Sequence, residues 1–366
     1  PGHAQAIGVS AATSGLGTIS VTLGGDVSAT GVTSARGVSA VGGAGAITVT
    51  TNADLDLDGE VVSAGLGILA QGTGPITVST NDDVQADSGD GIVATGGAGN
   101  VAVNVNANSN IDADNAGASG RGVNATSTTG NVTVTTATNT NITADSDGIV
   151  ATSTGAGDGG VDLVNDGNVT VNASGSVGLG NRVEGRGIAA SVTNGISAGR
   201  VDVQLTSTAQ VFSSQAGIQA ANNGLGDGNF ATVGVNVVTG VNTVVDAAGT
   251  SSGNSGISAS ITGGTNVNQL VVTVNGSVTG KGASGSPDGV NVANSGLGAT
   301  TITTGSSSSV VGGDDAIQVG VSNAANTKAT TITVNGVLNP NATSGAGWGV
   351  NSFTSGTGGI TTTISS

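Results

Sequence analysis

Neighbouring carboxylates are the residues of this chain whose types and spacing best suit catalysis. Asp82–Asp83 and Asp314–Asp315 each place two acidic groups together, and pairs of carboxylates carry out glycoside hydrolysis. His3 is the only histidine and lies near the N-terminus, and there is no cysteine, so neither a Ser-His-Asp triad nor a cysteine nucleophile is available. With one tryptophan and three phenylalanines, aromatic walls for a catalytic pocket are scarce. We therefore expect no enzymatic activity and assign no catalytic residue.

One acidic segment imitates a calcium-binding loop. Residues 54–59 read Asp-Leu-Asp-Leu-Asp-Gly, like the start of an EF-hand loop, but Gly65 stands where the bidentate glutamate belongs. The same spacing puts Leu55 and Leu57 on one face of a strand and the aspartates on the other. We therefore predict a strand here and no metal site.

Three further aspartates, Asp87, Asp114 and Asp145, each follow an apolar-x-Ala segment in successive copies of a repeat. If the copies stack in register, the three carboxylates form a column. Such a column either points into water or is bridged by calcium, which accepts several oxygen ligands in loose geometry. We expect the solvent-exposed arrangement, with calcium as the alternative, and assign no metal or cofactor.

The repeat itself fixes where these residues lie. Apolar-alternating segments recur in a fixed order, as in 91–94, 101–103 and 111–113, and the order begins again in the next copy. Alternation with period two is typical of strands with one buried face, and no stretch has helical spacing. The repeat predicts an all-β fold: a single-stranded, right-handed parallel β-helix of about eleven coils with three short strands each.

The alternation also predicts which side chains point inward. We expect one shared interior made of Ile92, Ala94, Val101, Val103, Ile111, Ala113, Val123, Ala125, Val132, Val134, Ile142 and Ala144. We expect Ala102, Asp112, Thr133, Thr143 and Asp145 to face water. A glycine opens every copy except the one that begins at Ala316, which predicts a sharp corner or a close backbone approach. Variation in loop length is expected at the corner after the third strand.

The residue before this glycine alternates in charge over four copies. It is Asp90, then Arg121, Asp147 and Arg186. In registered coils these side chains lie one above another, where opposite charges attract and like charges repel. We predict that Arg121 lies within ion-pair distance of Asp90 or Asp147.

Composition excludes several partners. The 366 residues include 67 glycines and carry a net charge of −16, which opposes binding to nucleic acids and to anionic membrane surfaces. No apolar run approaches the roughly 20 residues of a membrane-spanning helix, so we expect no membrane insertion of this segment. The interior must be a narrow one of Val, Ile and Ala.

We treat residues 1–366 as one continuous β-solenoid domain. Residues 1–7 are expected to form a disordered end or an end close to a signal-cleavage site. Ala4-Gln5-Ala6 fits the small-residue pattern of signal peptidases, and the alternative is a chance Ala-x-Ala in an Ala-rich chain. Residues 316–366 carry degenerate copies and are expected to form the terminal coils. Glycosylation sequons occur at Asn124, Asn131, Asn141, Asn168, Asn172, Asn275 and Asn341. In a chain this rich in Asn and Thr, we interpret them as strand and turn residues.

The recurring phrases GIVATSTGAG, GNVTVTT and ITADSDGI resemble the passenger region of bacterial autotransporters, the type V secreted proteins of Gram-negative outer membranes. The resemblance covers almost the whole chain. It implies export to the cell surface as a right-handed parallel β-helix, with a C-terminal translocator barrel outside these residues. It also implies an extracellular location.

These observations favour a surface-exposed or secreted adhesin or structural stalk in cell–surface and cell–cell attachment, including biofilm. The expected partner is a receptor on a host cell, another cell surface or a polysaccharide. One alternative is a subunit of an extracellular fibre that associates head to tail, because open solenoid ends present unpaired strand edges. A polysaccharide-degrading β-helix enzyme is the third.

Overall fold

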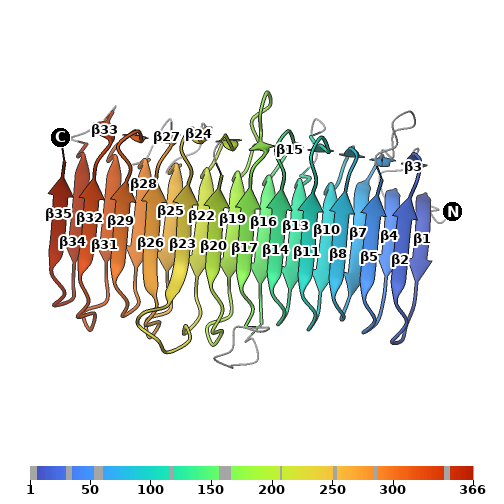
Figure 1. Cartoon of the computed structure of the whole chain (residues 1–366), viewed down its shortest axis with the longest axis horizontal. Helices are drawn as coiled ribbons and strands as arrows, with labels where there is room; N and C mark the ends of the chain where they lie inside the picture. The colour runs from blue at the N-terminus through green and yellow to red at the C-terminus, as the bar shows by residue number, and fades with distance from the viewer. Residues whose placement is uncertain are drawn as a thin grey trace.

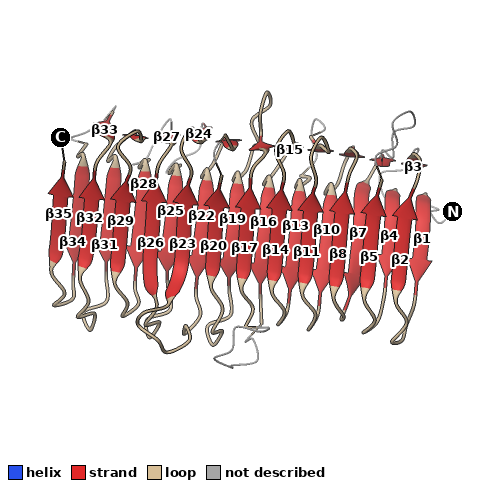
Figure 2. Cartoon of the chain, in the orientation of Figure 1, coloured by secondary structure: helices blue, strands red, loops and turns tan. Residues whose placement is uncertain are grey.

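The computed structural model describes residues 6–29, 35–52, 61–114, 119–155, 166–206, 208–249, 254–282, 287–341 and 347–365. Within them, 35 strands form three parallel sheets (Figures 1 and 2). His3 and the calcium-loop-like segment 54–59 lie outside the described residues.

The strands follow one another in strict rotation through the three sheets. The first sheet contains β1 (Ile7–Ala12), β4 (Arg36–Val41), β7 (Leu66–Gly72), β10 (Ile92–Gly96), β13 (Val123–Ser127), β16 (Ile149–Ser153), β19 (Ile188–Val192), β22 (Ile218–Asn222), β25 (Ile257–Ile261), β28 (Val290–Asn294), β31 (Ile317–Val321) and β34 (Val350–Thr354). The second contains β2 (Ile19–Leu23), β5 (Ile47–Thr51), β8 (Ile76–Thr80), β11 (Val101–Val105), β14 (Val132–Thr136), β17 (Val169–Ala173), β20 (Val201–Leu205), β23 (Val233–Thr239), β26 (Gln269–Val274), β29 (Thr300–Thr304), β32 (Thr330–Val334) and β35 (Ile360–Ile364). The third contains β3 (Val27–Ala29), β6 (Val61–Ser63), β9 (Val84–Ala86), β12 (Ile111–Ala113), β15 (Asn141–Ala144), β18 (Ser176–Val177), β21 (Gln210–Ser213), β24 (Val244–Gly249), β27 (Ser277–Gly282), β30 (Ser309–Gly312) and β33 (Val337–Pro340).

Each strand pairs only with the equivalent strands one coil before and one coil after it, where a coil is one set of three consecutive strands. In the second sheet, for example, Val101 of β11 lies opposite Val132 of β14 and Ile76 of β8. All pairings are parallel, and the colour in Figure 1 runs steadily from one end of the rod to the other. The predicted right-handed parallel β-helix is confirmed. At about 4.8 Å per coil the stack is roughly 50 Å long.

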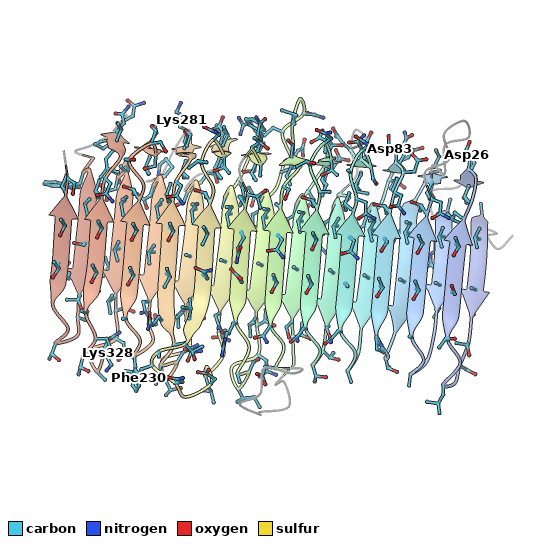
Figure 3. The ribbon with its side chains drawn as sticks, in the orientation of Figure 1. Asp26, Asp83, Phe230, Lys281 and Lys328 are labelled. Carbon is cyan, nitrogen blue, oxygen red and sulfur yellow. The ribbon has the colours of Figure 1, made fainter. Side chains whose placement is uncertain are left out.

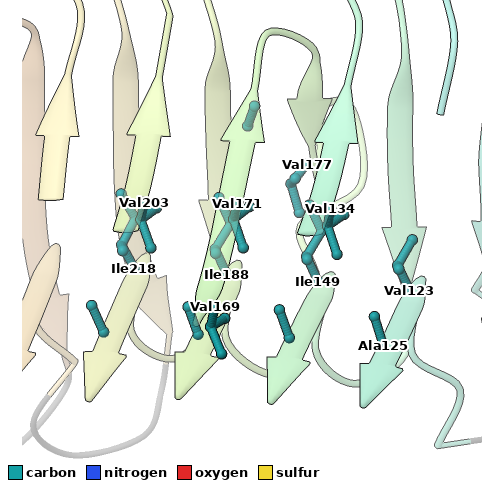
Figure 4. Close-up of a cluster of buried hydrophobic side chains, with 14 of the residues drawn as sticks. Val123, Ala125, Val134, Ile149, Val169, Val171, Val177, Ile188, Val203 and Ile218 are labelled. Carbon is teal, nitrogen blue, oxygen red and sulfur yellow. The ribbon is translucent and has the colours of Figure 1, made fainter. Parts of the chain in front are cut away.

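The interior is a set of columns of Val, Ile and Ala (Figure 4). All twelve residues predicted to point inward are buried. Of the residues predicted to face water, Asp112 is exposed, and Ala102, Thr133 and Thr143 are half-buried because side chains of adjacent coils flank them. The prediction is wrong for Asp145, which is 9% exposed. Asp145 follows the last residue of β15 at the corner, where neighbouring segments of the same chain cover its side chain.

Close approach of the chain requires glycine at the opening of the coils from Gly8 to Gly289, whereas Ala316 opens the coil of β31. A Cβ atom on Gly122 would lie 2.1 Å from Cγ2 of Ile142 and 2.6 Å from the carbonyl oxygen of Gly148 in the next coil. Gly91 meets Ile111 and Gly122 in the same way. None of these glycines has a positive φ, so close contact alone, and not a left-handed backbone, selects glycine here.

Loop length varies along more than one edge, which corrects the prediction of a single variable corner. We number the edges by the corner they contain: the first joins the first sheet to the second, the second joins the second to the third, and the third returns to the first. On the first edge the connection is 97–100 in one coil and 223–232 in another. On the second edge it is 81–83 or 106–110.

The stacking continues into the C-terminal coils. Residues 316–366 contain β31 to β35, which pair in the same register as the coils before them. No helix long and apolar enough to cross a membrane occurs in the described parts of the chain.

Candidate functional site

Asp and Asn side chains continue the hydrogen-bond ladder at the corners, beyond the ends of the strands. The Asp90 carboxylate accepts the backbone N–H of Arg121 one coil later, with a distance of 2.8 Å from Oδ1 to N. The Asn100 amide accepts the N–H of Asn131 in the same way, also at 2.8 Å. Each side chain therefore satisfies a backbone donor where no strand partner exists.

These side chains form runs along the rod. Asn131 accepts the N–H of Asn168, and Asn168 accepts that of Arg200. On the second edge, Asp83 accepts the N–H of Asn110, and Asn110 that of Asn141. The sequence analysis missed these ladders. The signal that could have found them is an Asn or Asp placed immediately before the strand in consecutive coils.

The column of alternating charge forms as predicted, but its ion pair is between different residues. The Arg186 guanidinium lies 2.7 Å from Asp147 Oδ2, and the backbone N–H of Arg186 donates to Asp147 Oδ1. Burial raises the pKa of Asp147, but the hydrogen bonds from Arg186 outweigh it and hold that pKa below its ordinary value.

The predicted ion pair of Arg121 is wrong. Within the described ranges, ion pairs join Arg182 to Asp246, Arg186 to Asp147 and Arg200 to Asp227, and none includes Arg121. The reason lies in the partners of Asp90. Its two carboxylate oxygens accept the backbone N–H of Arg121 and the side-chain amide of Asn124, so the Arg121 side chain is not needed.

The first carboxylate pair, Asp82–Asp83, is part of a corner. Asp82 accepts the backbone N–H of Asp83 at 2.7 Å, and Asp83 accepts both the backbone N–H and the side-chain amide of Asn110. Figure 3 shows Asp83 on the side of the rod that carries the third sheet. Both carboxylates therefore hold the chain at the second edge.

The second pair, Asp314–Asp315, is joined by Asp288 from the preceding coil. One carboxylate oxygen of each residue lies within 4.8 Å of the others, and these are the only three acidic, His or Cys groups that converge in this way among the described residues. Asp288 and Asp315 occupy the position before the coil opening that Asp90 occupies earlier. The repeat could have identified Asp288, because register places it directly against Asp315.

Asp288 and Asp315 are buried and have hydrogen-bond partners. Asp288 accepts the N–H of Asp315 at 3.3 Å and the amide of Asn291 at 3.0 Å. Asp315 accepts the N–H of Trp348 at 2.8 Å and the amide of Asn351 at 2.8 Å. Burial, together with the charges of Asp315 and Asp314, raises the pKa of Asp288 to about 7. The cluster has the oxygen ligands that calcium prefers, but Asp288 can also bind a proton instead of a calcium ion.

The column of Asp87, Asp114 and Asp145, expected to face water with calcium as the alternative, comes together only in part. Asp114 and Asp145 contact each other, whereas Asp87 accepts the side-chain amide of Gln85 at 3.4 Å. Burial, the hydrogen bond with Asp145 and the charges of Asp145, Asp112 and Glu184 raise the pKa of Asp114 to about 6. Below about pH 6, a proton on Asp114 therefore reduces its repulsion from Asp145.

Two loops join different coils, up to three coils apart, through cations. On the third edge, Arg182 lies 5.7 Å from the ring centre of Phe212 and pairs with Asp246 at 2.9 Å. On the first edge, the Lys328 ammonium lies 4.4 Å from the ring centre of Phe230 (Figure 3). Each contact joins residues that are distant in sequence and belong to different coils. Two of the four aromatic rings of the chain, those of Phe212 and Phe230, thus take part in cation–π contacts.

A groove of about 380 Å³ lies on the second edge, between coils of different corner length. Its walls come from the corners at Asn139 and Thr208, and its floor from Ser174, Gly175 and neighbouring residues. The complete set of residues that line it is Asn110, Thr138, Asn139, Thr140, Asn141, Ser174, Gly175, Ser176, Leu179, Thr208 and Gln210. The lining is uncharged and rich in amides and hydroxyls.

Several sequon asparagines are hydrogen-bonded within the fold. The side-chain amide groups of Asn124, Asn141 and Asn275 donate to Asp90, to the Leu179 carbonyl and to the Thr239 carbonyl. These amides act in corners and between coils, in agreement with their interpretation as structural residues.

Comparison with protein families, with curated proteins and with solved structures finds no match for this chain.

Proposed function

We propose that this chain is a non-enzymatic attachment rod, a surface-exposed or secreted β-helix that acts as an adhesin or structural stalk. The supporting observation is the unbroken stack from β1 to β35, in which the backbone ladders of the three sheets are continued at the corners by Asp and Asn side chains. Such a stack resists bending because every coil is bonded to both neighbours. The resemblance of the sequence to autotransporter passengers supports export of the chain to a Gram-negative cell surface.

Attachment by this rod is multivalent. Many outward positions of the second sheet are half-exposed small polar residues, such as Thr133 and Thr170 in successive coils and Thr301 further along the rod. Many weak contacts of one kind add up when a surface offers a matching array of partners. The receptor is therefore expected to be an extended surface, such as a polysaccharide or a cell coat.

The test is adhesion under flow. The chain is displayed through an unrelated outer-membrane anchor on a non-adherent bacterium, and cells retained on polysaccharide-coated and host-cell surfaces are counted. We expect severalfold greater retention than with the anchor alone. Retention equal to that of the anchor alone on every surface would refute the attachment role.

A second candidate, a subunit of a self-stacking fibre, is favoured by the apolar residues of the last coils. Val337, Trp348, Phe353 and Ile364 are all more than half exposed. They lie on or beside β33, β34 and β35, which pair with a neighbouring strand on one side only. Exposed strand edges with apolar side chains favour pairing with a further coil, either of the continuing chain or of a second copy. Scattering from concentrated chain should then report rods that lengthen at constant diameter, whereas a strict monomer would exclude the fibre.

A further inference from the structure

The corners of the second edge come in two lengths, and this difference creates the groove. The short corner at Ser174–Gly175 lies between β17 and β18, and the coils on either side have longer corners that contain Asn139 and Thr208. Asn139 and Thr208 both have positive φ, 59° and 85°. The long corners therefore project past the short one and leave a notch, which is the groove described above.

Three other short corners carry an asparagine at the position of Ser174. These residues are Asn81, Asn275 and Asn335, and each of their amides donates to the carbonyl of a threonine one coil earlier. Ser174 is too short to do so, and its hydroxyl instead accepts a hydrogen bond from Thr206 at 2.8 Å. The notch is open at Ser174 because the asparagine that occupies this place elsewhere is missing.

Unused hydrogen-bonding groups line the open notch. The side chains of Asn139, Ser176, Thr208 and Gln210 make no hydrogen bond to other residues in the described ranges. Two amides and two hydroxyls offer both donors and acceptors. Strand pairing fixes the positions of two of these residues, because Ser176 of β18 pairs in register with Gln210 of β21.

One side of the notch is apolar and fixed in place. Leu179 is 46% exposed, and its backbone N–H and C=O both bond to the Asn141 amide, at 3.1 Å and 2.9 Å. An aliphatic surface beside amides and hydroxyls matches the C–H face and the hydroxyls of a sugar ring. A volume of about 380 Å³ lies within the range of roughly 300–1,000 Å³ typical of small-ligand sites.

We propose that this notch binds a residue of a neutral saccharide. No charged side chain lines it, and the net charge of −16 disfavours acidic sugars. As a contribution to attachment, the site rests on the proposed function. Binding itself is measured on the purified chain, so a failed adhesion assay and a failed sugar titration are separate results.

The test is saturation-transfer NMR on the purified chain with glucose, galactose, mannose and N-acetylglucosamine, and with glucuronate as the charged comparison. We expect at least one neutral sugar to bind saturably in the millimolar range, and glucuronate to bind more weakly. Ser174→Asn, which inserts the residue found at the other short corners, should weaken binding by at least about tenfold without lowering the melting temperature. Gln210→Ala should also weaken binding, and Gln71→Ala, the same change at an exposed position of the first sheet, should not.

Absence of saturable binding by all four neutral sugars would overturn the proposal. So would unchanged affinity in both Ser174→Asn and Gln210→Ala, or tighter binding of glucuronate than of any neutral sugar. If Ser174→Asn does not fold, Gln210→Ala decides the question alone, because its side chain makes no hydrogen bond within the described residues whose loss would unfold the chain.

Discussion

Arg186 binds Asp147 through both its backbone and its side chain. The backbone N–H donates to Asp147 Oδ1 at 2.8 Å, and the guanidinium reaches Oδ2 at 2.7 Å. The Asp147 side chain is only 8% exposed, whereas that of Arg186 is 34% exposed. A nearly buried carboxylate is thus neutralised by a cation at the surface, one coil further along the rod.

This pair predicts different effects for two arginines in the same column. Arg186→Ala should lower the free energy of unfolding by about 1–2 kcal/mol, because it leaves the Asp147 carboxylate with fewer donors. Arg186→Asp should cost more, and the difference should shrink in high salt. Arg121→Ala is the matched control and should change stability by less than about 0.5 kcal/mol. Urea unfolding followed by circular dichroism measures all three, and equal losses at the two positions would contradict the assignment.

The opening glycine of a coil should not tolerate a side chain. Gly122→Ala should destabilise the chain strongly, because the added methyl would overlap Ile142 and the Gly148 carbonyl in the next coil. Gly24→Ala is the control: no atom lies within 4 Å of its Cβ position, and its φ is not positive. Removing glycine there should leave stability unchanged or raise it by up to about 1 kcal/mol. The melting temperatures of both variants are compared with that of the wild type. A Gly122→Ala variant that melts at the wild-type temperature would contradict the prediction.

Period-two alternation was enough to predict the sheets and the interior, because a slip of one residue would expose every Val and Ile of a strand. It could not place Asp145, since burial at a corner depends on how the adjacent loop folds over it. Arg121 was misassigned for a related reason. Register put it beside Asp90, but backbone donors and Asn124 compete for the same carboxylate. The groove arises from differences in corner length between neighbouring coils. These lengths could not predict the groove before the structure showed which corners lie side by side.

Divalent metal should be dispensable despite the convergence of Asp288, Asp314 and Asp315. The buried carboxylates of Asp288 and Asp315 already accept hydrogen bonds from the backbone and from Asn side chains, and Asp288 holds a proton near neutral pH. Thermal unfolding in excess chelator and in millimolar calcium should therefore give the same midpoint. A midpoint several degrees higher with calcium would show that the cluster binds the ion in the folded state.

Stability should fall as pH rises through neutrality, because of Asp288. Its pKa is raised from 3.8 to about 7 in the folded chain, so the folded state binds more protons than the unfolded state between these values. Stability is therefore greatest below about pH 4 with respect to this group, and the loss is complete above pH 7. A shift of this size corresponds to at most about 4 kcal/mol.

Asp288→Asn tests this dependence directly, because it removes the charge and keeps the shape. The variant should melt at a higher temperature than the wild type at pH 8. The advantage should largely disappear near pH 4, where the wild-type carboxyl is protonated in the folded state and about half protonated in the unfolded state. Asp26→Asn makes the same change of charge at an exposed corner, seen near the N-terminal end in Figure 3, and should show no such pH-dependent gain. An advantage of Asp288→Asn that is equal at both pH values would mean that packing, and not the buried charge, sets the stability of this corner.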